Sequence, residues 1–254
     1  MDGTIPDHNA AKPSRRTTPT VVDDRVFTLG AMGDIHCLEL ATGRVRWTKN
    51  LVTEFGARVP IWGFSSHPLC YKDLVVVVAG VEANASLVAL DQDTGRLVWK
   101  TLSDPAGYAT PILIGNRVFT FGRIDTDEVA MALDAGTGEL VWSYEPRTYD
   151  RLDRPGNMGW QHRGVSYWED DDSDDARVFI ATHDLFLVAL NAKTGTQYSD
   201  FGADGAVDLS TTLGRAVDRS RFTHSQPLAI AGNTVIVGSI VQDTNLQYRE
   251  ADPG

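Results

Sequence analysis

A pattern with a Thr-Gly pair at its centre recurs four times along the chain and restricts its possible folds more than any other feature. The copies are LELATGRVRW at 38–47, LDQDTGRLVW at 90–99, LDAGTGELVW at 133–142 and a degraded LNAKTGTQYS at 190–199. Their Thr-Gly pairs are 52, 43 and 57 residues apart. Repeats of this length indicate a protein built from similar units that stack on their neighbours.

Each copy follows a run of residues that favour β-strands. The runs are RVFTLG at 25–30, LVVVVAG at 74–80, RVFTFG at 117–122 and RVFIAT at 177–182. A second periodic signal consists of proline-led apolar segments, namely TPTVV at 18–22, HPLCY at 67–71, TPILI at 110–114 and QPLAI at 226–230. The combination predicts short strands joined by tight turns, four to a unit.

The Asp-x-x-Thr-Gly segment predicts a tight hairpin between the last two strands of a unit. The carboxylate of Asp91 or Asp134 can cap the turn, and Gly95 or Gly138 can adopt the positive φ that other residues resist. The strand that follows ends in a tryptophan in three of the four copies, and this large side chain is suited to wedging between neighbouring sheets. We therefore expect these residues to define the fold and not to form a site.

One four-stranded sheet cannot bury both of its faces, but radial stacking of several sheets can. The sequence therefore predicts an all-β fold, a β-propeller with four-stranded antiparallel blades. Helical crossovers are not expected, because no segment between the strands has a 3.6-residue apolar period. We expect about four blades and part of a fifth after a disordered polar segment at 1–14, within a propeller spanning 15–254. The expected blades are roughly 15–50, 64–102, 106–145, 160–200 and 222–254.

Composition excludes several classes of protein. The chain has 34 acidic and 23 basic residues, and its net charge of −11 argues against a nucleic-acid partner. Cys37 and Cys70 cannot form a disulfide framework or a four-cysteine zinc site. No apolar run reaches the roughly 18 residues of a membrane span, and Met1–Thr20 has no apolar core of a signal peptide. The acidic run at 169–175 is expected to be a solvated hairpin insertion.

The A-L-D-x-x-T-G-x-x-x-W pattern resembles the tryptophan-docking motif of the quinoprotein β-propellers. In that superfamily eight blades commonly surround the cofactor pyrroloquinoline quinone (PQQ), or an empty channel in non-catalytic relatives. Eight blades at the observed spacing would need about 400 residues. The sheets are therefore expected to close with fewer blades, to stay open with exposed strand edges, or to be a piece of a longer protein, and we favour the last of these.

The two halves of the chain resemble different branches of this superfamily. Residues 15–115 look most like the BamB-type repeat proteins of outer-membrane assembly. From about residue 105 onward the chain is similar to PQQ-dependent glucose and alcohol dehydrogenases. The segments that carry this second resemblance are RGVSYW at 163–168, the strand pair at 177–195 and the F-G…V-D-L stretch at 201–209.

The resemblance implies a set of cofactor contacts. PQQ is a planar tricarboxylate, and Arg163 stands where the dehydrogenases place an arginine near its carboxylates and quinone; a guanidinium suits that task. The alternative for Arg163 is a surface residue that neutralises the acidic run. Ser225 matches a hydroxyl that faces the cofactor, whereas His224 replaces the family's threonine and can be a donor or an ordinary polar strand residue.

A third matched segment implies a metal ligand. Ser239 would contact the cofactor, and Asp243 would ligate Ca²⁺. Calcium prefers six to eight hard oxygen ligands, so one aspartate is at most a fragment of its site. The aspartate that serves as catalytic base in the dehydrogenases has no counterpart that we can assign, and the paired neighbouring cysteines of many alcohol-oxidising relatives are missing.

Two functions follow as hypotheses. The first is part of a PQQ-dependent dehydrogenase that oxidises an aldose or alcohol by hydride transfer and passes electrons to a quinone or cytochrome partner. The second is a non-catalytic, BamB-type scaffold that binds proteins or polymers. Both imply a periplasmic protein. Because no base is assigned, we expect PQQ binding without turnover from this chain.

Overall fold

A computed structural model describes most of the chain. The described residues are 17–61, 63–81, 84–103, 109–124, 127–151, 164–214, 218–219 and 227–238. The predicted polar segment at 1–14 lies outside them.

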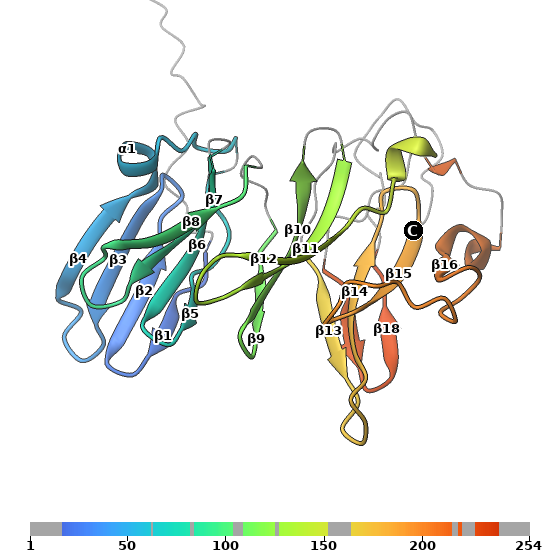
Figure 1. Ribbon diagram of the computed structural model, residues 1–254. Helices are drawn as coiled ribbons and strands as arrows, with labels where there is room; N and C mark the ends of the chain where they lie inside the picture. The colour runs from blue at the N-terminus through green and yellow to red at the C-terminus, as the bar shows by residue number, and fades with distance from the viewer. Residues whose placement is uncertain are drawn as a thin grey trace, which may run out of the picture.

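The described residues form four four-stranded antiparallel sheets and one two-stranded sheet (Figure 1). The first comprises β1 (Thr20–Val22), β2 (Arg25–Leu29), β3 (Asp34–Glu39) and β4 (Val45–Asn50). The second comprises β5 (Leu69–Tyr71), β6 (Leu74–Val81), β7 (Ala85–Asp91) and β8 (Leu97–Thr101). The third comprises β9 (Ile112–Ile114), β10 (Arg117–Ile124), β11 (Asp127–Asp134) and β12 (Leu140–Tyr144). The fourth comprises β13 (Ser166–Glu169), β14 (Ala176–Ala181), β15 (Phe186–Asn191) and β16 (Ala206–Asp208), and the fifth β17 (Ala229–Ala231) and β18 (Thr234–Ile236).

In each four-stranded sheet the strands pair in chain order, so every sheet is a simple meander. The helical elements with described bounds are short: α1 (Leu51–Phe55) and the 3₁₀ turns η1 (Thr148–Asp150) and η2 (Leu209–Leu213). The predicted all-β propeller with four-stranded blades is therefore confirmed.

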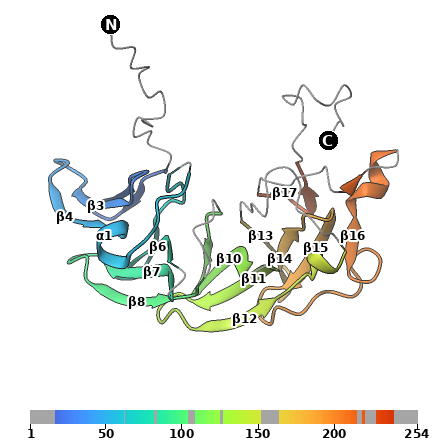
Figure 2. The same ribbon diagram turned by 90° about the horizontal axis from the view of Figure 1, so that it is seen from above.

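The sheets follow one another along an open arc, with β8 and β12 on its convex side (Figure 2). The first strands of neighbouring sheets touch: β1 contacts β5, β5 contacts β9, and β13 contacts β17. A hydrogen bond from the Thr20 hydroxyl to the Pro68 carbonyl, 2.5 Å long, joins the first two sheets at this inner edge. The sheets do not close into a ring.

The Thr-Gly hairpins have the predicted geometry. Asp91 Oδ1 accepts from the backbone N–H of Thr94 at 2.8 Å, and Asp134 Oδ1 accepts from that of Thr137 at 3.1 Å. Gly95 and Gly138 have φ values of +68° and +74°. The aspartate and the glycine of the repeat are thus explained by the turn alone.

Each tryptophan of the repeat lies over the turn glycine of the next sheet. A Cβ added to Gly95, Gly138 or Gly195 would lie 2.8, 2.6 or 2.7 Å from Trp47, Trp99 or Trp142, respectively. Trp47 Nε1 donates to the Gln92 carbonyl at 2.9 Å, and Trp142 Nε1 donates to the Ala192 carbonyl at 3.0 Å. The predicted wedge between sheets is therefore this indole, which needs a glycine opposite it.

The first sheet carries the same glycine without an indole over it. Gly43 has φ +70°, yet a Cβ added there would have nothing within 4 Å. Beside it Leu40 and Val45 are 50% and 52% exposed. The outer face of the first sheet is therefore uncovered in the described structure.

The core lies between adjacent sheets. Phe27 and Ile35 of the first sheet pack with Val77 and Leu90 of the second, and all four are at most 2% exposed. Similar clusters fill the spaces between the later sheets. Both cysteines are free, Cys37 buried and Cys70 half-buried.

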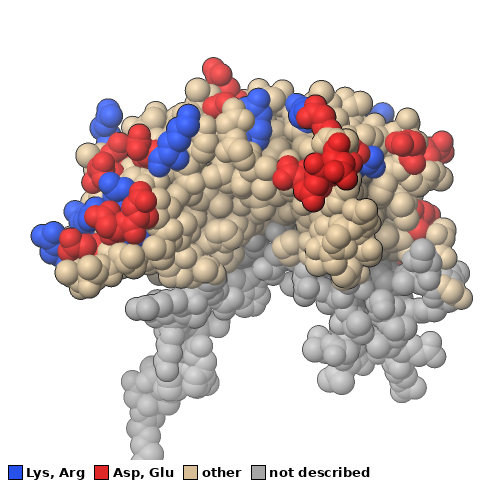
Figure 3. Space-filling view, turned by 90° about the horizontal axis from the view of Figure 1, so that it is seen from below, with Lys and Arg blue, Asp and Glu red and all other residues tan. Residues whose placement is uncertain are grey.

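Charged side chains of both signs are spread over the face of the molecule seen from below (Figure 3). Figure 3 shows Lys and Arg interspersed with Asp and Glu on the face seen from below, without a continuous basic patch. The acidic hairpin is an exposed turn between β13 and β14, as predicted. Among the described residues no helix is long and apolar enough to cross a membrane.

Candidate functional site

The predicted cofactor and metal contacts lie outside the described residues. They are Arg163, His224, Ser225, Ser239 and Asp243. The structure describes the residues from 164 onward, after Arg163, and those from 227 onward, after Ser225. These residues show which strands follow the two predicted contacts.

The residues after Arg163 and Ser225 meet at the inner edge of the arc. A Cβ on Gly164 would lie 2.9 Å from the Thr110 carbonyl oxygen, and this glycine has φ +118°. The Ser166 hydroxyl donates to the Leu228 carbonyl, which binds the start of β13 to the residues before β17. The described residues that follow Arg163 and Ser225 therefore lead into β13 and β17, which contact each other.

Tyr167, in the same R-G-V-S-Y-W segment, has a perturbed hydroxyl. It donates to Glu169 Oε2 at 2.9 Å. Burial, this hydrogen bond and the negative charge of Glu169 raise the pKa of Tyr167 to about 12. The ring therefore stays neutral well above neutral pH.

This pKa shift predicts a loss of stability at high pH. Between about pH 10 and 12 the unfolded chain loses the phenol proton that the folded chain keeps, so the folded state is disfavoured as pH rises. Between about pH 10 and 12 the unfolding free energy of Tyr167→Phe should therefore fall less than that of the wild type, as measured by urea denaturation. Cys70, whose pKa burial raises to about 12, adds a loss of the same sign that both proteins share. Equal losses in the two proteins would contradict the prediction.

A buried polar cluster joins the third and fourth sheets. Nδ1 of His183 lies 2.8 Å from Oε1 of Glu128, and both side chains are fully buried. The Thr148 hydroxyl, in η1, donates to the other oxygen of the same carboxylate. A carboxylate without water around it needs such partners, so the cluster fixes η1 to the start of β11.

Asp184, next to His183, accepts hydrogen bonds from arginines of two further loops. Its carboxylate, 1% exposed, accepts from Arg151 Nε and from the Thr182 hydroxyl. Its backbone carbonyl accepts from Arg219 Nη1 at 2.6 Å. Arg219 also binds Asp208, at 2.5 Å. One turn between β14 and β15 thus anchors the loops before and after the fourth sheet.

This turn has a strained backbone. Leu185 has φ +70° and is 1% exposed. The corresponding turn of the first sheet, between β2 and β3, has Gly33 with φ +91° at its end. Leucine resists this conformation, at a cost of roughly 1–2 kcal/mol, so the buried contacts around it must hold it there.

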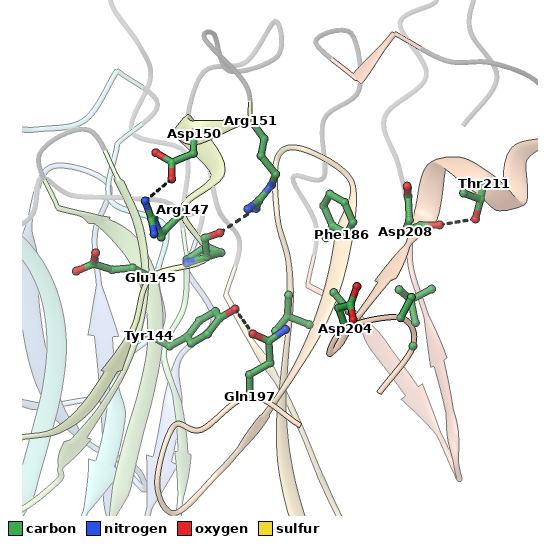
Figure 4. Close-up of a pocket in the computed structure, with 16 residues that line it drawn as sticks. Tyr144, Glu145, Arg147, Asp150, Arg151, Phe186, Gln197, Asp204, Asp208 and Thr211 are labelled. Carbon is green, nitrogen blue, oxygen red and sulfur yellow. Dashed lines mark hydrogen bonds and ion pairs between the residues drawn. The ribbon is translucent and has the colours of Figure 1, made fainter. Parts of the chain in front are cut away.

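A groove lies between the third and fourth sheets, with a volume of about 870 Å³ (Figure 4). One wall comes from Tyr144 and the residues that follow β12, and the other from β15 and residues 202–211. The Tyr144 hydroxyl donates to Gln197 Oε1 at 2.8 Å across it. Arg151 and Phe186 both line this groove beside the strained turn, and the Arg151 guanidinium lies over the Phe186 ring.

Within the described ranges no cluster of three or more His, Cys, Asp or Glu side chains could hold a metal ion. The implied calcium ligand lies beyond them. The sequence reading missed the Glu128–His183 cluster and the groove, since their residues are far apart along the chain. The one available signal was Thr-His-Asp at 182–184, a polar interruption between two apolar strands.

Two family profiles match the chain. The profile described as "Glucose/ethanol/alcohol dehydrogenase, beta-propeller domain" matches residues 101–254, and that of "Outer membrane protein assembly factor BamB" matches residues 4–154. Each covers more than half of the chain, and the division agrees with the two resemblances of the sequence.

Individual relatives agree with the first profile. A quinate/shikimate dehydrogenase (quinone) of Acinetobacter baylyi is 42% identical over 67 residues, 26% of this chain and 8% of its own length. A polyvinylalcohol dehydrogenase of Sphingopyxis sp. is 27% identical over 228 residues, 78% of this chain and 32% of its own. The chain thus matches less than a third of these relatives.

Among solved structures, quinohemoprotein alcohol dehydrogenase from Comamonas testosteroni superposes with a TM-score of 0.55 at 20% identity. The match covers 86% of this chain and 38% of that one. At 20% identity this similarity shows a shared fold and nothing more.

Proposed function

Because the chain belongs to the family of PQQ-type β-propellers found in glucose, ethanol and alcohol dehydrogenases, we propose that it forms one side of the cofactor site of such an enzyme. The enzyme would oxidise an aldose or an alcohol and pass the electrons to a quinone or cytochrome partner in the periplasm. The observation that carries the proposal is the junction of Gly164, Ser166 and Leu228, which joins the strands that follow Arg163 and Ser225.

The donor set fits the cofactor chemically. PQQ carries three carboxylates and two quinone oxygens, and the Arg163 guanidinium can pair with a carboxylate while Ser225, Ser239 and His224 donate to other oxygens. Asp243 would supply one hard oxygen to Ca²⁺. If bound, PQQ would supply the oxidising chemistry for an alcohol or aldose. The roles of the residues would be to bind the cofactor, to orient it and to stabilise its charge.

A binding experiment tests this. We expect the full chain with Ca²⁺ to bind PQQ, seen as quenching of tryptophan fluorescence and a higher melting temperature, without oxidation of glucose or ethanol. Arg163→Gln should raise Kd by about 10–100-fold, since a hydrogen bond to a charged group contributes about 1.5–3 kcal/mol. Arg44→Gln is the control, because the Arg44 side chain is 75% exposed and is paired with Glu39 in the first sheet. Failure of the wild type to bind saturating PQQ would exclude the proposal.

The BamB-type match at 4–154 supports a second candidate, a scaffold without cofactor. Protein or polymer partners would then bind the faces of the blades. Binding of a partner by a chain that does not bind PQQ would favour this function.

A further inference from the structure

We propose that the groove between the third and fourth sheets binds a neutral polyhydroxylated ligand, a saccharide or polyol chain. The proposal does not depend on PQQ binding, because the groove is formed by described residues other than the cofactor contacts proposed above. Its volume of about 870 Å³ is in the range of small-molecule sites, roughly 300–1,000 Å³.

The walls of the groove are fixed before any ligand arrives. Arg151 is bound on one side by the buried Asp184 carboxylate and on the other by the Pro146 carbonyl, to which Nη2 donates at 2.8 Å. Its guanidinium lies 5.3 Å from the ring centre of Phe186, and that of Arg219 lies 4.9 Å from the same ring. Such support reduces the entropy lost when a ligand binds.

The arginines of the groove are all paired with carboxylates, and the lining as a whole carries more negative than positive charge. Each arginine at or beside it has its own carboxylate: Arg147 pairs with Asp150, Arg151 with Asp184 and Arg219 with Asp208. The lining also includes the exposed carboxylates of Glu145 and Asp204. An anionic ligand would therefore meet paired cations and surplus negative charge, which disfavours it.

The groove is lined by both polar and apolar groups, a combination that suits hydroxyl groups on a carbon skeleton. Phe186, Val188 and Val207 provide apolar surface, and the Tyr144 ring lies on the facing wall (Figure 4). Arg147 uses Nη2 toward Asp150 at 2.6 Å and keeps other N–H donors for a ligand. Carboxylate oxygens accept from hydroxyls. A saccharide or polyol offers donors, acceptors and C–H faces together.

The test uses the full chain without PQQ. Titration calorimetry with maltotriose should show saturable binding. Phe186→Leu and Arg147→Gln should each weaken it by about 3–10-fold, the loss of one aromatic contact or one hydrogen bond. Arg44→Gln is a matched control, since Arg44 is an exposed arginine paired with a carboxylate, Glu39, at 3.5 Å, but lies in the first sheet. Quinate, a polyol that carries a carboxylate, should bind more weakly than maltotriose.

Each other outcome would overturn the proposal. No saturable binding at about 10 mM maltotriose would mean that the groove has no useful affinity for this class. An equal effect of Arg147→Gln and Arg44→Gln would place the ligand elsewhere. Tighter binding of quinate would show that the groove selects an anion.

Discussion

Gly195→Ala should lower the free energy of unfolding by about 3 kcal/mol, and Gly43→Ala by about 1 kcal/mol. Both glycines have positive φ, +73° and +70°, so an alanine has the same backbone strain at each. The positions differ in what covers them. A Cβ on Gly195 would lie 2.7 Å from the Trp142 indole, whereas a Cβ on Gly43 meets nothing within 4 Å. The difference in urea-induced unfolding therefore measures the contact between indole and glycine.

A double-mutant cycle strengthens this test. Trp142→Ala alone should cost about 3–5 kcal/mol, because it opens a cavity and removes the hydrogen bond to the Ala192 carbonyl. In that background Gly195→Ala should cost only about as much as Gly43→Ala, since the clash is gone. If Gly195→Ala costs the same with and without Trp142, the indole does not set the need for glycine.

The blades could be predicted from sequence because their determinants are local and repeated. Asp91, Thr94 and Gly95 form one turn within five residues, and the same turn recurs in the later copies. A period of about 50 residues then specifies the stacking of similar sheets. These features require no knowledge of which distant residues meet.

The groove and the buried cluster depend on unique, long-range contacts. Glu128 and His183 are 55 residues apart, and Tyr144 and Gln197 are 53 apart. Glu128, Tyr144 and His183 lie outside the repeat copies, and Gln197 occupies a position of the degraded fourth copy where the other copies have valine or leucine. Leu185 occupies a backbone conformation that sequence alone would assign to glycine or asparagine. Only the packed structure brings them together, and the cofactor contacts that were predicted by resemblance remain predictions.

Glu128→Gln should destabilise the protein by about 2–4 kcal/mol, the second large effect that we expect. The side chains of Glu128 and His183 are both 0% exposed, so neither can turn to water when the pair is changed. Glutamine has nearly the same shape but removes the charge and one of the two equivalent acceptors, and it leaves either His183 or Thr148 poorly matched. Urea denaturation at neutral pH gives the loss directly.

A control variant and a local measurement distinguish the loss of the Glu128 contacts from a general effect of replacing glutamate by glutamine. Glu139→Gln makes the same chemical change at an exposed position of the next hairpin and should stay within about 0.5 kcal/mol of the wild type. Because Thr148 anchors η1 to this carboxylate, Glu128→Gln should also speed amide exchange at 148–151 more than in β3 of the first sheet. Unchanged exchange in η1 would mean that other contacts hold this loop, and with it one wall of the groove, in place.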